Sequence, residues 1–201
     1  MFIHRLLFAS IFIVCCLTTL TNGASLPNGE VEALHLISSI LGADWNSIID
    51  PCSRDNSWTL DQNVSCDCSF NDKTTCHVTH IFLRRQNLSG TLPPNLASLS
   101  YLQQIDLSRN YLSGPIPREW GSSTRLVNIS LLGNRLTDSI RIELANLRNL
   151  TSLILENNGL LGTLPEALGN LSKVERLHLS SNYFTGKIPE TFASLTSLKA
   201  L

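Results

Sequence analysis

Apolar residues recur at a fixed interval along most of this chain of 201 residues. In residues 102–125, LQQIDLSRNYLSGPIPREWGSSTR, they fall at positions 1, 4, 6, 11 and 15 of a 24-residue unit. An asparagine stands at position 9, a glycine at position 13 and a proline at position 16. Steps of one unit keep this pattern in register, without a gap, from residue 78 to residue 201. The chain is therefore expected to be an array of one short structural unit.

Positions 4 and 6 of the unit predict a short strand with one buried face, because they are the apolar members of an alternating run. One unit cannot bury its own apolar row, whereas stacked units cover one another and align their strands in parallel. The core L-x-x-L-x-L-x-x-N-x-L is that of leucine-rich repeats. We therefore expect an α/β repeat fold, a right-handed leucine-rich-repeat solenoid with parallel strands on its inner face. The residues at these two positions are Ile81, Leu83, Ile105, Leu107, Ile129, Leu131, Leu153, Leu155, Leu177 and Leu179.

Position 9, where each predicted strand turns away, holds Asn110, Asn134, Asn158 and Asn182. A side-chain amide there can satisfy backbone groups that the turn leaves unpaired, in its own repeat and in the next. Recurrence at one repeat position predicts a structural role for these asparagines rather than ligand binding.

The third repeat departs from the pattern, because Asp138 and Arg141 replace the glycine and the proline. Its return path, residues 141–150, has a more helix-like apolar spacing and is expected to be helical or irregular. Either drift of non-core positions or a functional change would explain the departure.

Residues 1–24 are expected to be a secretory signal peptide. Arg5 gives a positive start, residues 6–20 form an apolar run, and small polar residues follow, with cleavage after Gly23 or Ala24. An uncleaved anchor is the alternative. No other stretch approaches the roughly 18 apolar residues that a membrane-spanning helix needs.

Residues 25–77 are expected to form an N-terminal cap. A helix is predicted to start at Asn28 or Gly29 and to cover the first open layer of the solenoid, with acidic residues in its first turn favouring the helix dipole. The rest of the cap, with Trp45 and Trp58, is expected to be irregular and polar, and Trp58 is interpreted as a packing residue, with a ligand contact as the alternative. The helix is assigned Glu30 and Glu32 in its first turn, an apolar face of Val31, Leu34, Ile37 and Leu41, and an end at Gly42.

Four cysteines follow the signal segment: Cys52, Cys66, Cys68 and Cys76. An even number in a secreted chain predicts two disulfides, and zinc binding is the alternative. Four cysteines allow three pairings. Because short loops close at the lowest entropic cost, we predict Cys52–Cys66 and Cys68–Cys76.

Composition excludes several functions. With 15 basic and 16 acidic residues the formal net charge is −1, too small to recruit nucleic acid or an anionic membrane. No catalytic or phosphate-binding motif is found, and none of the histidines at positions 4, 35, 77, 80 and 178 has a spaced carboxylate partner that stands out. The chain is therefore not expected to be an enzyme, and neither a metal nor another cofactor is expected.

The exposed strand positions are the candidate binding surface, since charges there surround Phe82, Leu132 and Ile154. Such mixed surfaces suit peptide or protein recognition, and ordinary solvated residues are the alternative. Thr79, Ser108 and Ser152 are expected to be exposed on the same face. The candidate binding residues are Phe82, Arg84, Arg85, Asp106, Arg109, Ile154, Glu156, Arg176 and His178.

N-linked glycosylation is expected at some of the acceptor motifs Asn63, Asn87, Asn128, Asn149 and Asn170. Asn128 is expected on the inner face, where a glycan would narrow the binding surface.

Residues 78–201 hold five complete repeats and the start of a sixth, Leu198 to Leu201. A solenoid end needs a capping element. The chain is therefore expected to be the front part of a longer protein.

The strings PCSRDNSW, NVSCDCSFNDKTTCHVTHI, LQQIDLSRNYLSGPIPREWG and LVNISLLGNRL closely resemble the ectodomain start of plant leucine-rich-repeat receptor-like serine/threonine kinases. The resemblance covers residues 28–201 and is to the subgroup with a malectin-like domain. Asp138 and Arg141 depart from the family pattern. The resemblance implies an extracellular ectodomain fragment that binds a peptide, protein or cell-wall ligand and a co-receptor, in a parent with a membrane helix and a kinase. A complete secreted protein of the polygalacturonase-inhibitor kind is the alternative, and a structural cell-wall role would need proline-rich repeats that this chain lacks.

Overall fold

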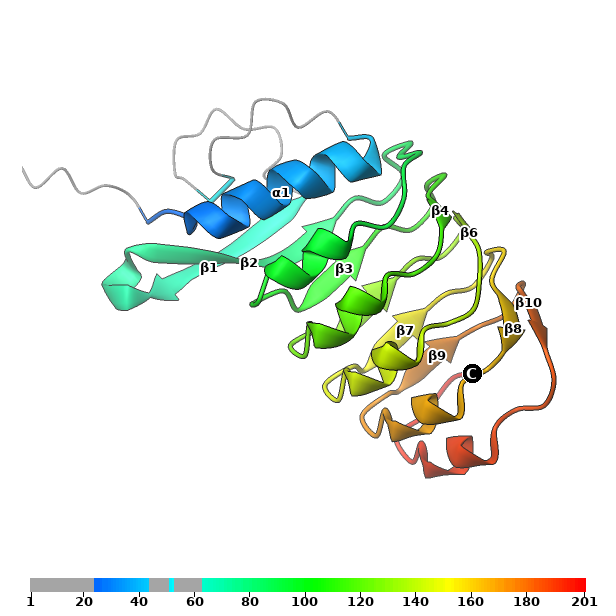
Figure 1. Cartoon of the computed structure of the whole chain (residues 1–201). Coiled ribbons are helices and arrows are strands. Elements are labelled where there is room, and N and C mark those ends of the chain that lie inside the picture. The colour runs from blue at the N-terminus through cyan, green and yellow to red at the C-terminus, as the bar shows by residue number, and fades with distance from the viewer. Residues whose placement is uncertain (1–23, 44–50, 53–62) are drawn as a thin grey trace, which may run out of the picture.

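The structure is a computed structural model, and it describes residues 24–43, 51–52 and 63–201. The expected signal segment (except Ala24), Trp45 and Trp58 lie outside the described residues. Helix α1 (Asn28–Leu41) is followed by stacked turns of chain that carry a strand on one side and a short 3-10 helix on the other (Figure 1). The predicted leucine-rich-repeat solenoid is confirmed.

One sheet of six strands forms the concave side, in the order β1-β2-β3-β5-β7-β9. Strand β1 runs antiparallel to β2, and every later pair is parallel with a register step of one repeat, as in Ile105↔Ile129↔Leu153. The constant repeat length that predicted the strands therefore also determines which residues pair. The strands are β1 (Val64–Phe70), β2 (Thr75–Phe82), β3 (Gln104–Asp106), β5 (Asn128–Ser130), β7 (Ser152–Ile154) and β9 (Arg176–His178).

Two small parallel sheets lie where the chain leaves the concave side (Figure 1). Strand β4 (Ser113–Gly114) pairs with β6 (Arg135–Leu136), and β8 (Leu161–Thr163) pairs with β10 (Tyr183–Thr185). The return paths then form 3-10 helices, which are η2 (Pro94–Ser98), η3 (Arg118–Ser122), η4 (Ile142–Asn146), η5 (Glu166–Asn170) and η6 (Glu190–Ser194); a further one, η1 (Asn71–Lys73), joins β1 to β2.

The return path of the third repeat is helical, one of the two expected alternatives, but it does not differ from the others, because η4 is a five-residue 3-10 helix like its neighbours. Asp138 adopts a left-handed backbone with φ 66°, where Gly114 has φ 77°. Aspartate is one of the few side chains that tolerate this region. Arg141 has φ −73° and ψ 133°, close to the −64° and 134° of Pro117, so the extended entry to the helix does not depend on proline.

The apolar rows fill the space between the sheet and the 3-10 helices. Leu107, Leu131 and Leu155 are fully buried in successive repeats. Trp120 of η3 is also buried, and its indole N–H donates to the Pro93 carbonyl at 2.9 Å. The core is thus one continuous column, in which each layer covers the next.

The predicted structural role of the position-9 asparagines is confirmed, but the neighbouring repeat that they bind is the preceding one and not the next. The Nδ2 of Asn134 donates to the carbonyls of Leu107 and Leu131, both at 3.0 Å, and its Oδ1 accepts from the Leu112 amide at 3.1 Å. Each asparagine therefore binds backbone of its own repeat and of the preceding one. Asn110, Asn158 and Asn182 repeat the same pattern of bonds.

Helix α1 covers the first layer, as predicted, and ends at Gly42 with φ 69°. It buries Leu34, Ile37 and Leu41 completely. The helix approaches the first repeat so closely that a Cβ built on Gly90 would lie 1.8 Å from the Ile40 carbonyl oxygen. Glycine at this place is therefore required by contact with the cap.

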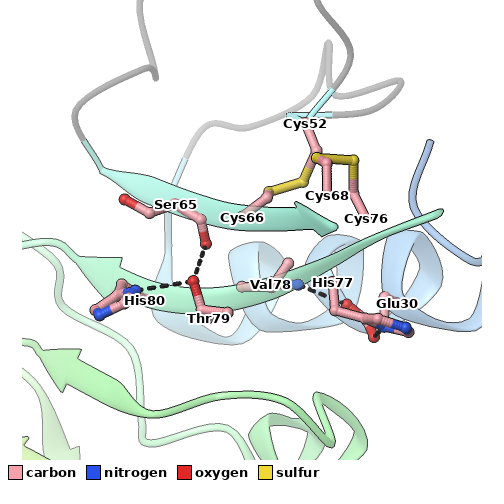
Figure 2. Close-up of a disulfide and its surroundings, with 10 residues drawn as sticks. All are labelled: Glu30, Cys52, Ser65, Cys66, Cys68, Cys76, His77, Val78, Thr79 and His80. Atoms are coloured by element: carbon pink, nitrogen blue, oxygen red, sulfur yellow. Dashed lines mark hydrogen bonds and ion pairs between the residues drawn. A yellow bond between two sulfur atoms is a disulfide. The ribbon is translucent and has the colours of Figure 1, made fainter. Parts of the chain in front are cut away.

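Residues 64–77 are not irregular as expected, but belong to the β1–β2 hairpin. Strand β2 runs without interruption across residues 77 and 78, where the cap was divided from the repeats. The disulfide Cys68–Cys76 links β1 to β2 and Cys52–Cys66 attaches residue 52 to β1, which confirms the predicted pairing (Figure 2). The cysteines alternate with polar residues along β1, so Cys66 and Cys68 share one face of the strand.

Candidate binding face

The concave face presents three rows of side chains, fixed by the register of the parallel strands. Because successive strands align one repeat apart, side chains of one row come from different repeats yet lie next to each other. The first row is His80, Gln104, Asn128, Ser152 and Arg176, the second is Phe82, Asp106, Ser130, Ile154 and His178, and the third, just past the strands, is Arg84, Ser108, Leu132, Glu156 and Ser180.

A hollow of about 350 Å³ lies across the middle of these rows. Of the predicted binding residues it brings together five, which are Phe82, Arg84, Asp106, Ile154 and Arg176. Gln104, Asn128, Ser130 and Leu132 complete much of its rim and floor. None of these four was in the list of candidate binding residues, although Asn128 and Leu132 were expected on the inner face, and steps of one repeat from His80, Phe82 and Arg84 reach all four.

The remaining predicted residues lie beside the hollow. Arg85 and Arg109 come where their strands end, in left-handed backbone with φ 58° at both. The carboxylate of Glu156 lies 3.9 Å from the Nδ1 of His178 on the next repeat. These four residues therefore belong to the same face but not to the lining of the hollow.

Three residues expected on the surface are buried instead. Thr79, Ser108 and Ser152 are 7%, 2% and 3% exposed. Each is a small side chain between larger neighbours, and the hydroxyl of Thr79 donates to the Ser65 carbonyl of the hairpin at 3.1 Å (Figure 2). Strand alternation predicts the side on which Ser152 lies but not the height of its neighbours, and Thr79 falls at a register shift between β1 and β2.

The concave face continues onto the cap. A second hollow, of about 660 Å³, is lined by β1, β2 and the start of β3, and it shares Phe82 and Gln104 with the first. Cys66, Asp67 and His80 lie on its walls. A ligand on the concave face can therefore contact the cap hairpin as well as the repeats.

His77 does have a carboxylate partner, contrary to the expectation from the sequence. Glu30 of α1 is 5% exposed, and its Oε1 lies 2.5 Å from the His77 Nδ1 while its Oε2 accepts from the Val78 amide at 2.9 Å (Figure 2). His77 stacks on Tyr101 at 3.8 Å between ring centroids, and the Arg125 guanidinium lies 4.3 Å from the centre of the Tyr101 ring. These contacts of Glu30, His77, Tyr101 and Arg125 join the cap to the first two repeats.

The cysteines are not available to a metal. All four sulfur atoms are in disulfides, which removes the thiolates that zinc would need. In residues 24–43, 51–52 and 63–201 no group of three metal-ligating side chains comes together. Over the same ranges, no helix has the length and apolar character needed to cross a membrane.

Comparison with known proteins agrees with this architecture. The family models for leucine-rich repeats match residues 101–123 and 148–201. The leucine-rich-repeat ectodomain of the receptor kinase SOBIR1 from Arabidopsis thaliana is 30% identical, with a TM-score of 0.76 over 88% of this chain and 92% of that one. The plant peptide hormone receptor RGFR1, solved in complex with RGF2, is 34% identical, with a TM-score of 0.55 over 56% of this chain and 18% of that one.

The chain thus belongs to the leucine-rich-repeat proteins, and among them to the ectodomains of plant receptor-like kinases. A probable leucine-rich repeat receptor-like serine/threonine-protein kinase of Arabidopsis thaliana is 45% identical over 113 residues, half of this chain. The chain spans only about a tenth (11%) of the length of that relative. The solved structure with the TM-score of 0.76 is a leucine-rich-repeat ectodomain, so the likeness is to that part of the receptor kinases.

Proposed function

We propose that this chain recognises an extended peptide or protein segment on its concave face. The observation that carries the proposal is the hollow in which apolar side chains, Phe82, Leu132 and Ile154, lie among the charges of Arg84 and Arg176. Apolar contacts supply affinity in such a surface, and the charged rim supplies specificity. All strands that carry these residues are held in one register by the core, so the face is preorganised before a ligand arrives.

In this proposal the chain works outside the cell, as the ectodomain of a membrane receptor-like serine/threonine kinase with a malectin-like domain and a co-receptor. The likeness to receptor-kinase ectodomains supports this placement. The full-length transcript tests it: a reading frame that continues into a malectin-like domain, a membrane helix and a kinase is expected. A stop codon directly after the repeats would favour a secreted protein instead.

The acceptor asparagines are proposed to carry glycans. Asn87, Asn149 and Asn170 are exposed, whereas Asn63 and Asn128 are half-buried. Asn128 lines the hollow, and its Oδ1 accepts from the Thr151 hydroxyl at 3.1 Å. We expect glycopeptide mapping of the secreted chain to find glycans at the exposed positions, and a fully occupied Asn128 would argue against peptide binding in the hollow.

The binding proposal is tested with the full chain, secreted and panned against a phage-displayed library of random peptides. Selected peptides are then measured against two variants with matched chemistry. Ile154→Glu places a charge in the hollow, and Ile142→Glu places the same charge at the start of η4, where the side chain is 63% exposed on the opposite side.

We expect Ile154→Glu to abolish the binding of selected peptides and Ile142→Glu to leave it unchanged. Both variants should melt within a few degrees of the parent, because neither residue belongs to the buried column. Peptides that bind Ile154→Glu as tightly as the parent would show that recognition takes place elsewhere.

A further inference from the structure

Two arginines at opposite ends of the hollow have no carboxylate partner. Arg84 follows β2 and Arg176 begins β9, and both line the hollow. In the part of the chain that the structure describes, neither guanidinium forms an ion pair, although the Nε of Arg176 donates to the Ser152 hydroxyl at 3.3 Å. The carboxylate inside the hollow, Asp106, already accepts the Ser108 amide at 2.9 Å. The hollow therefore carries positive charge at both ends that no ion pair neutralises.

Each arginine has an apolar neighbour on the face. Phe82 lies two residues before Arg84 on the same side of β2. Ile154 lies on β7 opposite His178 of β9, so it is diagonal to Arg176, whose own register partner is Ser152. Between the two ends, the floor is formed by the short polar side chains of Asn128 and Ser130. The hollow thus has two cationic, partly apolar ends and a polar middle.

The spacing of the arginines follows from the sheet. Arg176 is in register with His80, through the pairs Ser152↔Arg176, Asn128↔Ser152, Gln104↔Asn128 and His80↔Gln104, and Arg84 lies four residues beyond His80. Four strand spacings of about 4.8 Å and four residues of about 3.3 Å place the two Cα atoms about 23 Å apart. Both residues line the hollow between them, and guanidinium groups that reach into it would be closer than the two Cα atoms.

We propose that this hollow selects an extended acidic peptide in which two carboxylates, about four to six residues apart, bracket an apolar side chain. The spacing is the number of extended residues that fits between the two guanidinium groups. The apolar side chain packs against Phe82 or Ile154. This inference rests on the proposed function, since it assumes that the concave face binds peptides, and it adds the chemical class of the ligand.

The test uses fluorescence anisotropy with labelled synthetic peptides, blocked at both ends so that only side chains carry charge. The parent peptide has two aspartates four positions apart and a leucine midway, so that all three side chains point to the same side of an extended chain, with serine and glycine elsewhere. Its companions replace both aspartates by asparagine, replace both by lysine, place the two aspartates next to each other, or replace leucine by serine. Each is titrated with the full chain and with Arg84→Gln, Arg176→Gln and the control Arg118→Gln, whose side chain is 75% exposed outside the hollow.

We expect the parent peptide to bind about tenfold more tightly than the asparagine and adjacent-aspartate peptides, and the lysine peptide not to bind. Arg84→Gln and Arg176→Gln should each weaken the parent peptide about tenfold and leave the asparagine peptide unchanged. Arg118→Gln should change neither. The double variant Arg84→Glu with Arg176→Glu should bind the lysine peptide in preference to the parent.

The outcomes separate the two proposals. If the asparagine or lysine peptide binds the wild-type chain as tightly as the parent, and Ile154→Glu abolishes that binding, the face recognises peptides but not acidic ones. If adjacent aspartates bind as well as separated ones, the two arginines do not act together. If none of these peptides binds and panning selects none that depends on Ile154, both the ligand class and the proposed function are wrong.

Discussion

In four of the five repeats, an asparagine at the same position binds the backbone groups that the turn exposes, whereas in the cap a carboxylate from α1 binds such a group at a single place. Asn134 makes three bonds to backbone of two repeats. Glu30 binds the Val78 amide and the His77 ring, which lie far from it in the sequence. The cap adds two disulfides, and the repeats have none. A periodic region can use one solution many times, while its end, which has only one repeat neighbour, needs contacts that occur once.

The largest expected effect lies in the repeats. Leu131→Ala removes a side chain that is fully buried in the middle of the column, and we expect it to lower the free energy of unfolding by about 2–5 kcal/mol. The matched control is Leu161→Ala, since Leu161 on β8 is 48% exposed, and this change should alter the free energy of unfolding by less than about 0.5 kcal/mol. Denaturant unfolding measures both. Equal effects of the two changes would mean that the column does not stabilise the chain.

This part of the molecule is also the part that the sequence predicts best. The repeat period fixes the register, the buried rows and the asparagine ladder together, because any other alignment would expose the leucines. The third repeat shows where such prediction fails. Its substitutions at Asp138 and Arg141 change residue types that usually set the turn, yet the backbone is kept because both residues tolerate the required dihedrals.

The second effect concerns the cap. Replacing Cys68 and Cys76 together by serine opens a loop with a sequence separation of 8 residues. The chain-entropy model assigns such a loop about 2.5 kcal/mol. We expect hydrogen exchange to become faster in β1 and β2 and to stay unchanged in β7 and β9, since each repeat contacts only its neighbours. Uniform loss of protection along the whole sheet would show that cap and repeats unfold as one unit.

A third, smaller effect separates the role of the acceptor Oδ1 of the Asn134 side chain from that of its donor Nδ2. Asn134→Asp keeps the oxygen that accepts from the Leu112 amide but loses the donor to the Leu107 and Leu131 carbonyls. We expect a loss of about 1–3 kcal/mol in the free energy of unfolding, because the two carbonyls then face a carboxylate oxygen. Asn146, exposed in η4, gives the control Asn146→Asp, which should be nearly neutral. A neutral Asn134→Asp would mean that the ladder depends on acceptance alone.

The cap resists prediction from the sequence for a physical reason. Its partners are far apart in the chain and occur once, so no period relates Glu30 to His77, and a glutamate in a first helical turn is adequately explained by the helix dipole. The disulfides are an exception, since the low cost of closing short loops was enough to give the pairing. The concave hollow is predicted in part. The repeat period places its residues in rows, but only the structure shows that small residues such as Ser108 and Ser152 are buried between their larger neighbours.

The smallest expected effect tests whether the cap carboxylate acts through its charge or through its two acceptor positions. Glu30→Gln retains an oxygen for the Val78 amide and presents an N–H₂ group to the His77 Nδ1, which can accept in the neutral ring. We therefore expect Glu30→Gln to cost less than about 1 kcal/mol, while Glu30→Ala, which leaves the buried Val78 amide unpaired, costs about 1–3 kcal/mol. Thermal unfolding of both variants, with the exposed Glu32→Gln as the control, gives the comparison. If Glu30→Gln is as damaging as Glu30→Ala, the negative charge itself holds His77 against Tyr101, and the cap is joined to the repeats by an ion pair rather than by hydrogen bonds.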